Sequence, residues 1–132
     1  MKARFPSADA YSAEQPHYPA LEVIDIRAHQ ANVRESYRND VLSNVNDDCV
    51  RLAVFEGEYR WHRHPDSDEL FLVVEGKLLI DVAGHPTMEL GAWQYAVVPA
   101  GTVHRTRTIG RTANLAFERQ KAGTVFMDAA DR

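Results

Sequence analysis

Two histidines separated by one residue, with a glutamate shortly after them, have the clearest capacity for chemistry in this sequence. His62 and His64 lie in a run typical of a β-strand, where alternation places both imidazoles on one face. Glu69 follows the turn at residues 65–68 and opens the next strand-like run. Two imidazoles and a carboxylate suit a borderline divalent cation, and a site with three or four protein ligands leaves positions open to water or substrate.

The same residues also have a plainer interpretation. His-x-His occurs on solvated sheet faces, and Glu69 would then pair with an arginine. Alternation places Glu58 and Arg60 on the histidine face. It directs Tyr59 and Trp61 to the opposite face, where outer packing is expected. A buried arginine needs a partner, so Arg60 is expected either to pair with Glu58 or to bind an anionic substrate.

An all-β scaffold is expected to position these residues. Short strand-like runs alternate with glycine and proline turns, which is typical of a β-sandwich or barrel. The runs are residues 50–55, 58–64, 69–74, 77–82, 95–99, 102–108 and 113–119. Both alternating faces of residues 69–74 are apolar beyond Glu69, so both are expected to be covered. Later in the chain, His104, Thr106 and Thr108 share an inward face.

Length and composition predict one domain over residues 1–132. The chain is 45% hydrophobic and 26% charged, which is typical of a folded globular protein. Three parts are expected: an N-terminal part at 1–40, the barrel at 41–119 and a C-terminal tail at 120–132. The N-terminal part is predicted to contain an extended arm rich in proline, followed by a strand at 21–26 and a short helix around 28–37.

Two longer motifs resemble those of the cupin family. Residues 57–76, GEYRWHRHPDSDELFLVVEG, resemble the first cupin motif, in which glycine, His-x-His, glutamate and glycine follow in order. Residues 91–108, GAWQYAVVPAGTVHRTRT, resemble the second motif, built around Pro-x-Gly-x-x-His. The spacer after Gly57 is one residue shorter than in the family, and the spacer after Gly91 is two residues longer. Thr108 stands where the family has asparagine. The histidine-containing stretch is similar to that of small bacterial cupins described as mannose-6-phosphate isomerase-like.

The resemblance implies a double-stranded β-helix, or jelly-roll, barrel with a metal near one end. Carried over by position, the implied metal ligands are His62, His64, Glu69 and His104. Asp68 is an alternative carboxylate ligand on a shorter spacing. The departure at Thr108 affects substrate contacts more than metal binding, because this position usually faces the barrel interior. The candidate pocket residues are Arg60, Phe71, Thr106 and Thr108.

The implied function is that of a metal-dependent enzyme acting on a small molecule, with Fe, Mn, Ni or Zn as the cation. Dioxygenase chemistry needs a redox metal, whereas isomerase or lyase chemistry needs a Lewis acid, and the sequence selects neither. No second carboxylate or tyrosine can be placed beside the site as a general base. A non-catalytic module that binds or senses a small molecule is the alternative function.

A homodimer is expected from the apolar outer face of residues 70–74. The predicted strand at 21–26 can add to a neighbouring sheet edge and cover that face. Small cupins resemble one another in pairing in this way. The alternative is that the chain's own N-terminal part covers the face within a monomer.

Composition argues against several partners and compartments. A net charge of −4 with scattered lysine and arginine argues against nucleic acid, and no apolar run is long enough to span a membrane. The start has no apolar segment of the secretory kind, and the single cysteine, Cys49, is expected to be a packed thiol of a cytoplasmic protein. His85 is expected to be solvated at a hairpin tip, and His17 and His29 lack any paired spacing.

Overall fold

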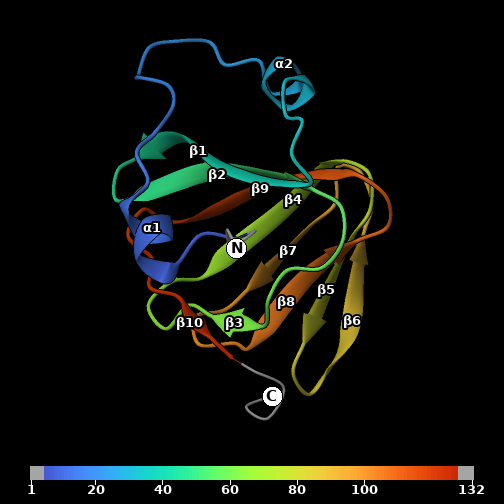
Figure 1. Ribbon diagram of the computed structural model, residues 1–132. Coiled ribbons are helices and arrows are strands. Elements are labelled where there is room, and N and C mark those ends of the chain that lie inside the picture. The colour runs from blue at the N-terminus through green and yellow to red at the C-terminus, as the bar shows by residue number, and fades with distance from the viewer. Residues whose placement is uncertain (1–4, 128–132) are drawn as a thin grey trace.

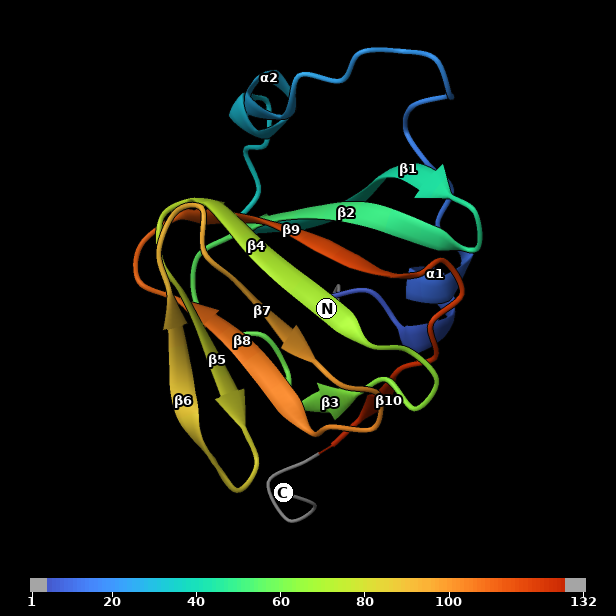
Figure 2. The same cartoon turned by 180° about the vertical axis from the view of Figure 1, so that it is seen from behind.

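Two antiparallel sheets that face each other dominate the computed structural model, which describes residues 5–127 (Figures 1 and 2). The first sheet has the order β1 (Tyr37–Val45), β2 (Asp48–Phe55), β9 (Thr112–Arg119), β4 (Glu69–Glu75) and β7 (Tyr95–Val98). The second has the order β10 (Val125–Phe126), β3 (His62–Arg63), β8 (His104–Thr108), β5 (Leu78–Val82) and β6 (His85–Leu90). The expected all-β double-stranded β-helix is thereby confirmed.

Side-chain alternation builds an apolar layer on each face of the first sheet. On β4, Phe71 and Val73 point into the barrel and are buried, whereas Leu72 and Val74 point outward and are half-buried. The buried residues of the inner core are Ala53, Phe55, Phe71, Val73, Leu78, Ile80, Leu90, Val98 and Ala116. The buried residues of the outer cluster are Val33, Leu42, Leu52, Val54, Ala113 and Leu115. The inner face of β4 is buried, and its outer face is half-buried, so the cover that the apolar pattern predicted is complete on the inner side alone.

The turn between β4 and β5 depends on a glycine. Gly76 has a φ of +89°, and a Cβ there would lie 2.5 Å from Oγ1 of Thr112 and 2.7 Å from the carbonyl oxygen of Arg111. Residues with side chains rarely adopt this conformation, and β9 leaves no space for one. This close approach packs the turn against the start of β9.

The N-terminal part forms two short helices, so the prediction of a strand at 21–26 is wrong. The arm contains α1 (Ala8–Ala13), where the Ser7 hydroxyl accepts a hydrogen bond from the amide of Ala10. Asp25 has the same capping role for α2 (Ile26–Ala31), and it accepts from the amide of Ala28. Because Asp25 caps a helix within the run 21–26, the chain begins a helix at Ile26 instead of completing the predicted strand. The helix therefore begins before the predicted range of 28–37 and ends at Ala31, and Tyr37 already belongs to β1.

Three strands that are polar or very short were not predicted from the sequence, namely β1, β6 and β10. The first strand, β1, begins before the predicted barrel, and its first residues are mostly polar. The β6 strand is largely exposed, so it lacks an apolar face, and β10 has two residues within the predicted tail. The run at 58–64 contributes only the two residues of β3 to a named strand. Among residues 5–127, no helix is long and apolar enough to span a membrane.

Candidate metal centre

Four buried side chains converge inside the barrel from three strands. His62 lies on β3, His64 follows that strand, Glu69 opens β4 and His104 opens β8. His62 and His104 are direct partners in the register of β3 with β8, so their rings lie with centroids 4.4 Å apart. The candidate ligand atoms of all four residues lie within 4.8 Å of one another. The structure therefore brings together the complete ligand set that the motifs implied.

Backbone carbonyls orient the three imidazoles. The Nδ1 atoms of His62, His64 and His104 lie 2.8, 2.9 and 2.8 Å from carbonyl oxygens. Those carbonyls belong to Arg60, Gly123 and Thr102. A carbonyl only accepts, so each Nδ1 carries the proton and each Nε2 in the neutral ring keeps its lone pair for the shared centre. This second layer of bonds is typical of metal-ligating histidines.

Buried polar atoms at the centre lack hydrogen-bond partners among the described residues. They are Nε2 of His64, Oε1 of Glu69 and Nε2 of His104. The Glu69 oxygen lies 3.2 Å from Nε2 of His64 and 3.6 Å from Nε2 of His104, yet neither contact has hydrogen-bond geometry. Buried groups without partners are costly, and a cation between these atoms would satisfy all three. The residues fit a divalent cation.

The geometry favours Glu69 over Asp68 as the carboxylate of the cluster. Glu69 is buried and points inward from β4. Asp68 is exposed, and its Oδ1 accepts a hydrogen bond from the amide of Ala100. Because neighbouring residues of an extended chain point to opposite sides, one of the two acidic side chains is directed away from the histidines.

Burial and the neighbouring groups set the charge of each side chain at the centre. Burial, followed by the neighbouring imidazoles of His104 and His64, lowers the pKa of His62 to about 3. Burial also acts to lower the pKa of His64, but the close contact with the Glu69 carboxylate and the charge of Glu118 outweigh it and raise that pKa to about 9. Burial opposes ionisation of Glu69, yet His104 and His64 hold its pKa well below the usual value. A proton on His64 therefore neutralises Glu69 in the position that a cation would take.

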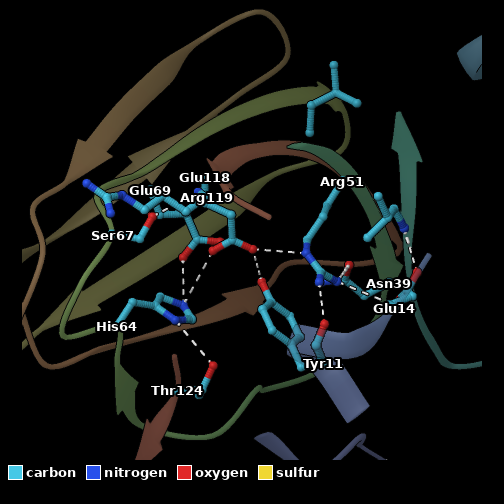
Figure 3. A network of polar contacts seen from close by, with 12 residues as sticks. Tyr11, Glu14, Asn39, Arg51, His64, Ser67, Glu69, Glu118, Arg119 and Thr124 are labelled. Atoms are coloured by element: carbon cyan, nitrogen blue, oxygen red, sulfur yellow. Dashed lines mark hydrogen bonds and ion pairs between the residues drawn. The ribbon is translucent and has the colours of Figure 1, made fainter. Parts of the chain in front are cut away.

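A second carboxyl group, Glu118 on β9, lies beside the centre (Figure 3). Its Oε2 is 3.8 Å from Nε2 of His64, and its Oε1 accepts a hydrogen bond from the hydroxyl of Tyr11 on α1. Burial and the negative charge of Glu69 raise the pKa of Glu118 to about 8. This carboxyl group can exchange a proton near neutral pH, within reach of a ligand histidine.

A buried arginine fixes Glu118 and α1 together. The Nε atom of Arg51 lies 3.0 Å from Oε1 of Glu118, and the side chain of Arg51 is 1% exposed. Its guanidinium also donates to the backbone carbonyl of Tyr11 at 2.7 Å and to Oδ1 of Asn39 at 3.1 Å (Figure 3). Arg51 is thus a fully enclosed cation that ties β2 and β9 to the N-terminal helix beside the site.

The sequence contained one signal for this network. Glu118 is an acidic residue at an inward position of a predicted strand, in the same alternation as Asn114 and Ala116. A buried acid in a strand signals a paired or functional group. Tyr11 carries no comparable signal, because its helix lies in a segment predicted to be extended.

The cavity at the centre is small and has both aromatic and polar lining residues. Its volume is about 30 Å³, and its lining includes Tyr11, Tyr37, Tyr59, Phe71 and Thr106. This volume holds about one water molecule. Two of the predicted pocket residues, Phe71 and Thr106, therefore lie at the cavity.

The other two predicted pocket residues lie elsewhere. Arg60 is exposed, with its guanidinium carbon 3.7 Å from the ring centroid of Phe126. Residues 59–61 are outside the strand, so alternation does not apply there, and Tyr59 takes the place at the cavity that Arg60 was predicted to take. The Oγ1 of Thr108 accepts a hydrogen bond from the amide of Gly57 and has a structural role.

The predicted ion pair of Glu58 with Arg60 is replaced by another pair. The carboxylate of Glu58 lies 3.0 Å from a guanidinium nitrogen of Arg105 on β8. Trp61 packs outside the barrel as expected, with the guanidinium carbon of Arg105 5.2 Å from the centroid of its ring. His85 is exposed in the hairpin of β5 and β6, in agreement with its predicted place.

Comparisons with known proteins agree with the fold and with the motifs. The family model described as "Cupin domain" matches residues 50–117. The uncharacterized protein YdbB of Bacillus subtilis (strain 168) is 55% identical over 96 residues, which cover 73% of this chain and 85% of that protein. A cupin-2 domain containing protein from Shewanella frigidimarina has a crystal structure with a TM-score of 0.69 and 29% identity, over 74% of this chain and 94% of that chain. For protein NMB1881 from Neisseria meningitidis the TM-score is 0.68 and the identity 28%, over 74% and 99% of the two chains. This chain belongs to the cupin domain family.

Proposed function

We propose that this chain is a metal-dependent enzyme acting on a small molecule, with Fe, Mn, Ni or Zn bound by His62, His64, Glu69 and His104. The observation that carries the proposal is the set of three buried ligand atoms without hydrogen bonds at the centre. Carbonyl contacts at all three Nδ1 atoms support it, because they leave each Nε2 free to coordinate. Four protein ligands leave room for a substrate or water ligand on a cation that accepts five or six.

The residues around the centre support catalysis rather than storage of a cation. The cation would supply Lewis-acid chemistry or, if it is redox-active, dioxygen chemistry. Glu118 holds or accepts a proton 3.8 Å from Nε2 of His64, and the Tyr11 hydroxyl on α1 donates a hydrogen bond to the same carboxyl group. Arg51 keeps the carboxyl of Glu118 in place, and Phe71 lines the cavity with its ring centroid 6.0 Å from that of His104.

A module that binds a small molecule without converting it is the second candidate function. The cavity of about 30 Å³ beside Tyr11 has no space for a molecule larger than water, so a larger ligand or substrate needs this space to widen. The two functions differ in whether a molecule bound at the centre is turned over.

Metal analysis tests the cation, and turnover tests the enzyme. Protein purified without chelator is analysed for bound metal, together with His62→Ala and His104→Ala variants and a His85→Ala control. We expect the first two variants to lose the metal of the barrel interior and the control to keep it. Unchanged metal content in folded His62→Ala and His104→Ala variants would overturn the proposed site.

A substrate screen then separates the two functions. The loaded protein is tested with diketones, sugar phosphates and catechols, beside a Glu118→Gln variant that keeps the four ligands. We expect turnover by the natural sequence and a loss of at least about 100-fold in Glu118→Gln, since a positioned acid or base contributes about that much. Binding of a compound without turnover, in the natural sequence and in the variant, would favour the binding module.

A homodimer is part of the proposal. Phe117, Leu70 and Val97 form an outward row across β9, β4 and β7, and Phe117 and Val97 are 41% and 49% exposed. Leu21 and Val23 are fully exposed on the segment between the two N-terminal helices, although they form no strand. An apolar segment and an apolar sheet face of this kind suit a second copy of the chain.

Light scattering at micromolar concentration tests the dimer. The alternative has support from Tyr18, Ile26 and Val33, which pack within the same chain on the outer cluster. We expect twice the mass of 14.9 kDa for the full chain and a weaker dimer after deletion of residues 1–26. A species of single mass at these concentrations would contradict the dimer.

We assign the protein to the cytoplasm. Cys49, the single cysteine of the sequence, is a free and buried thiol that a reducing compartment preserves. Burial raises the pKa of this thiol to about 11, which makes it unreactive. Cell fractionation tests this compartment, and recovery with exported proteins would contradict it.

A further inference from the structure

We propose that His17, His29 and Asp40 form a second divalent-cation site, on the outer face of the first sheet. Nothing in the proposed enzyme function requires this site, and its residues are separate from the four ligands in the barrel. The cation would fasten the N-terminal segment to β1. Two imidazoles and one carboxylate suit Zn²⁺, Ni²⁺, Cu²⁺ or Co²⁺ better than Mg²⁺ or Ca²⁺, which prefer oxygen ligands.

The three side chains already lie at distances suited to one ion. Nε2 of His29 is 2.8 Å from Oδ2 of Asp40, and Nε2 of His17 is 3.5 Å from Oδ1 of the same carboxylate. The two imidazole centroids are 5.4 Å apart. One ligand atom from each residue falls in a group whose members all lie within 4.8 Å of one another. Small shifts of these side chains would direct all three groups at a shared cation.

The backbone holds the cluster in place from three segments. The amide of His17 donates to the carbonyl of Val41 at 2.9 Å, so the segment after α1 is bonded to β1 next to Asp40. The neighbouring amide of Tyr18 donates to the carbonyl of Leu42 at 3.0 Å. His29 comes from α2, which lies over this face of the sheet (Figure 1). Main-chain hydrogen bonds therefore hold His17 beside Asp40, and α2 brings His29 to the same carboxylate.

Alternation along β1 separates this cluster from the metal centre in the barrel. Asn39 lines the inner cavity, whereas Asp40 is the register partner of Leu52 on β2, which belongs to the outer cluster. Asp40 therefore points away from the barrel interior. A cation held by Asp40 cannot be shared with His62 and His104, so the two sites are expected to bind two separate ions.

The surrounding groups suit a site that is open on one side. The hydroxyl of Tyr18 lies 2.6 Å from Nδ1 of His29 and can accept its proton, which leaves Nε2 as the ligand. Side chains of His29 and Asp40 are 10% and 9% exposed, but that of His17 is 36% exposed, so an ion can enter from solvent past His17.

Arg38 limits how tightly the outer site can bind. Its Nε lies 3.0 Å from Oδ1 and 2.9 Å from Oδ2 of Asp40, so a positive charge already contacts the carboxylate. This charge repels a cation and weakens binding relative to the barrel site, which has one more ligand. Two affinities are therefore expected in one titration, with the weaker one at the outer site.

Counting zinc equivalents tests the proposal. The full chain, stripped of metal, is titrated with Zn²⁺ by calorimetry, and we expect two equivalents per chain. His17→Ala should keep the tight equivalent and weaken the other at least about tenfold. His62→Ala should affect the tight equivalent alone, so failure of the barrel site and failure of the outer site are distinguishable. His85→Ala, at an exposed histidine, is the matched control and should keep both equivalents.

Two outcomes would overturn the outer site. One is a single equivalent in the full chain that is lost in His62→Ala and unchanged in His17→Ala. The other is a second equivalent whose affinity falls as much in His85→Ala as in His17→Ala, which would assign it to adventitious surface binding. Circular dichroism checks the fold of His17→Ala, and Asp40→Asn provides a second variant that removes the carboxylate charge while it keeps the side-chain volume.

Discussion

Binding of a cation in the barrel is expected to release a proton from His64. The pKa of this imidazole is raised to about 9, so His64 is almost fully protonated at neutral pH and must lose that proton to coordinate. Affinity should therefore rise about tenfold per pH unit, or about 90-fold between pH 6 and pH 8, and level off above pH 9. His62 adds nothing to this slope, because its pKa of about 3 leaves it neutral throughout. Calorimetric zinc titration in buffers of different ionisation enthalpy counts the protons released. In the His17→Ala protein, where the outer site is weakened, we expect about one proton released for each zinc ion bound in the barrel.

A control variant decides which group loses the proton. Glu118 has a pKa of about 8 and contacts His64, so it is the other candidate source. In Glu118→Gln the release of about one proton should persist, because Glu69 still holds the proton on His64. Loss of the release in this variant would assign the proton to Glu118. An affinity that is flat between pH 6 and pH 8 in the parent protein would refute the charge arrangement of the centre.

Three further predictions concern the ligands, the fold and the network beside them. Glu69→Gln should weaken zinc binding less than His62→Ala, because the amide oxygen still coordinates, and equal losses in calorimetry would contradict Glu69 as a ligand. Gly76→Ala should destabilise the protein by more than about 2 kcal/mol in urea unfolding, through a positive φ and the clash with β9. Gly84→Ala shares the positive φ but meets no atom within 4 Å, so an equal loss there would refute the clash. Tyr11→Phe removes a hydrogen bond to a buried carboxyl and should cost about 1–3 kcal/mol with zinc affinity retained. A thermal scan that leaves Tyr11→Phe unchanged would contradict it.

Sequence reasoning was reliable where local pattern and burial agree. The strand at 69–74 was predictable because both of its faces are apolar, and tertiary contacts bury one of them and half-bury the other. The convergence of His62, His64, Glu69 and His104 followed from two ordered motifs, because a barrel of this topology places β3 beside β8.

Predictions failed where tertiary contacts override the local pattern. Arg60 was placed by strand alternation, but the backbone at 59–61 is irregular, and Tyr59 turns toward His62 instead, with ring centroids 5.2 Å apart. His17 and His29 appeared unrelated because they are twelve positions apart in the sequence, and only the path of the chain over β1 brings them to Asp40. Long-range contacts of this kind leave no periodic trace in a single sequence.

Anomalous diffraction from crystals grown with zinc tests the central claim most directly. Data collected on both sides of the zinc absorption edge locate every bound ion without assumption about its ligands. We predict a peak within ligand distance of His62, His64, Glu69 and His104 in the barrel, and its absence from crystals of His104→Ala. A zinc-soaked crystal with no peak among these four residues, or with an unchanged peak in His104→Ala, would contradict the claim that they form a metal centre.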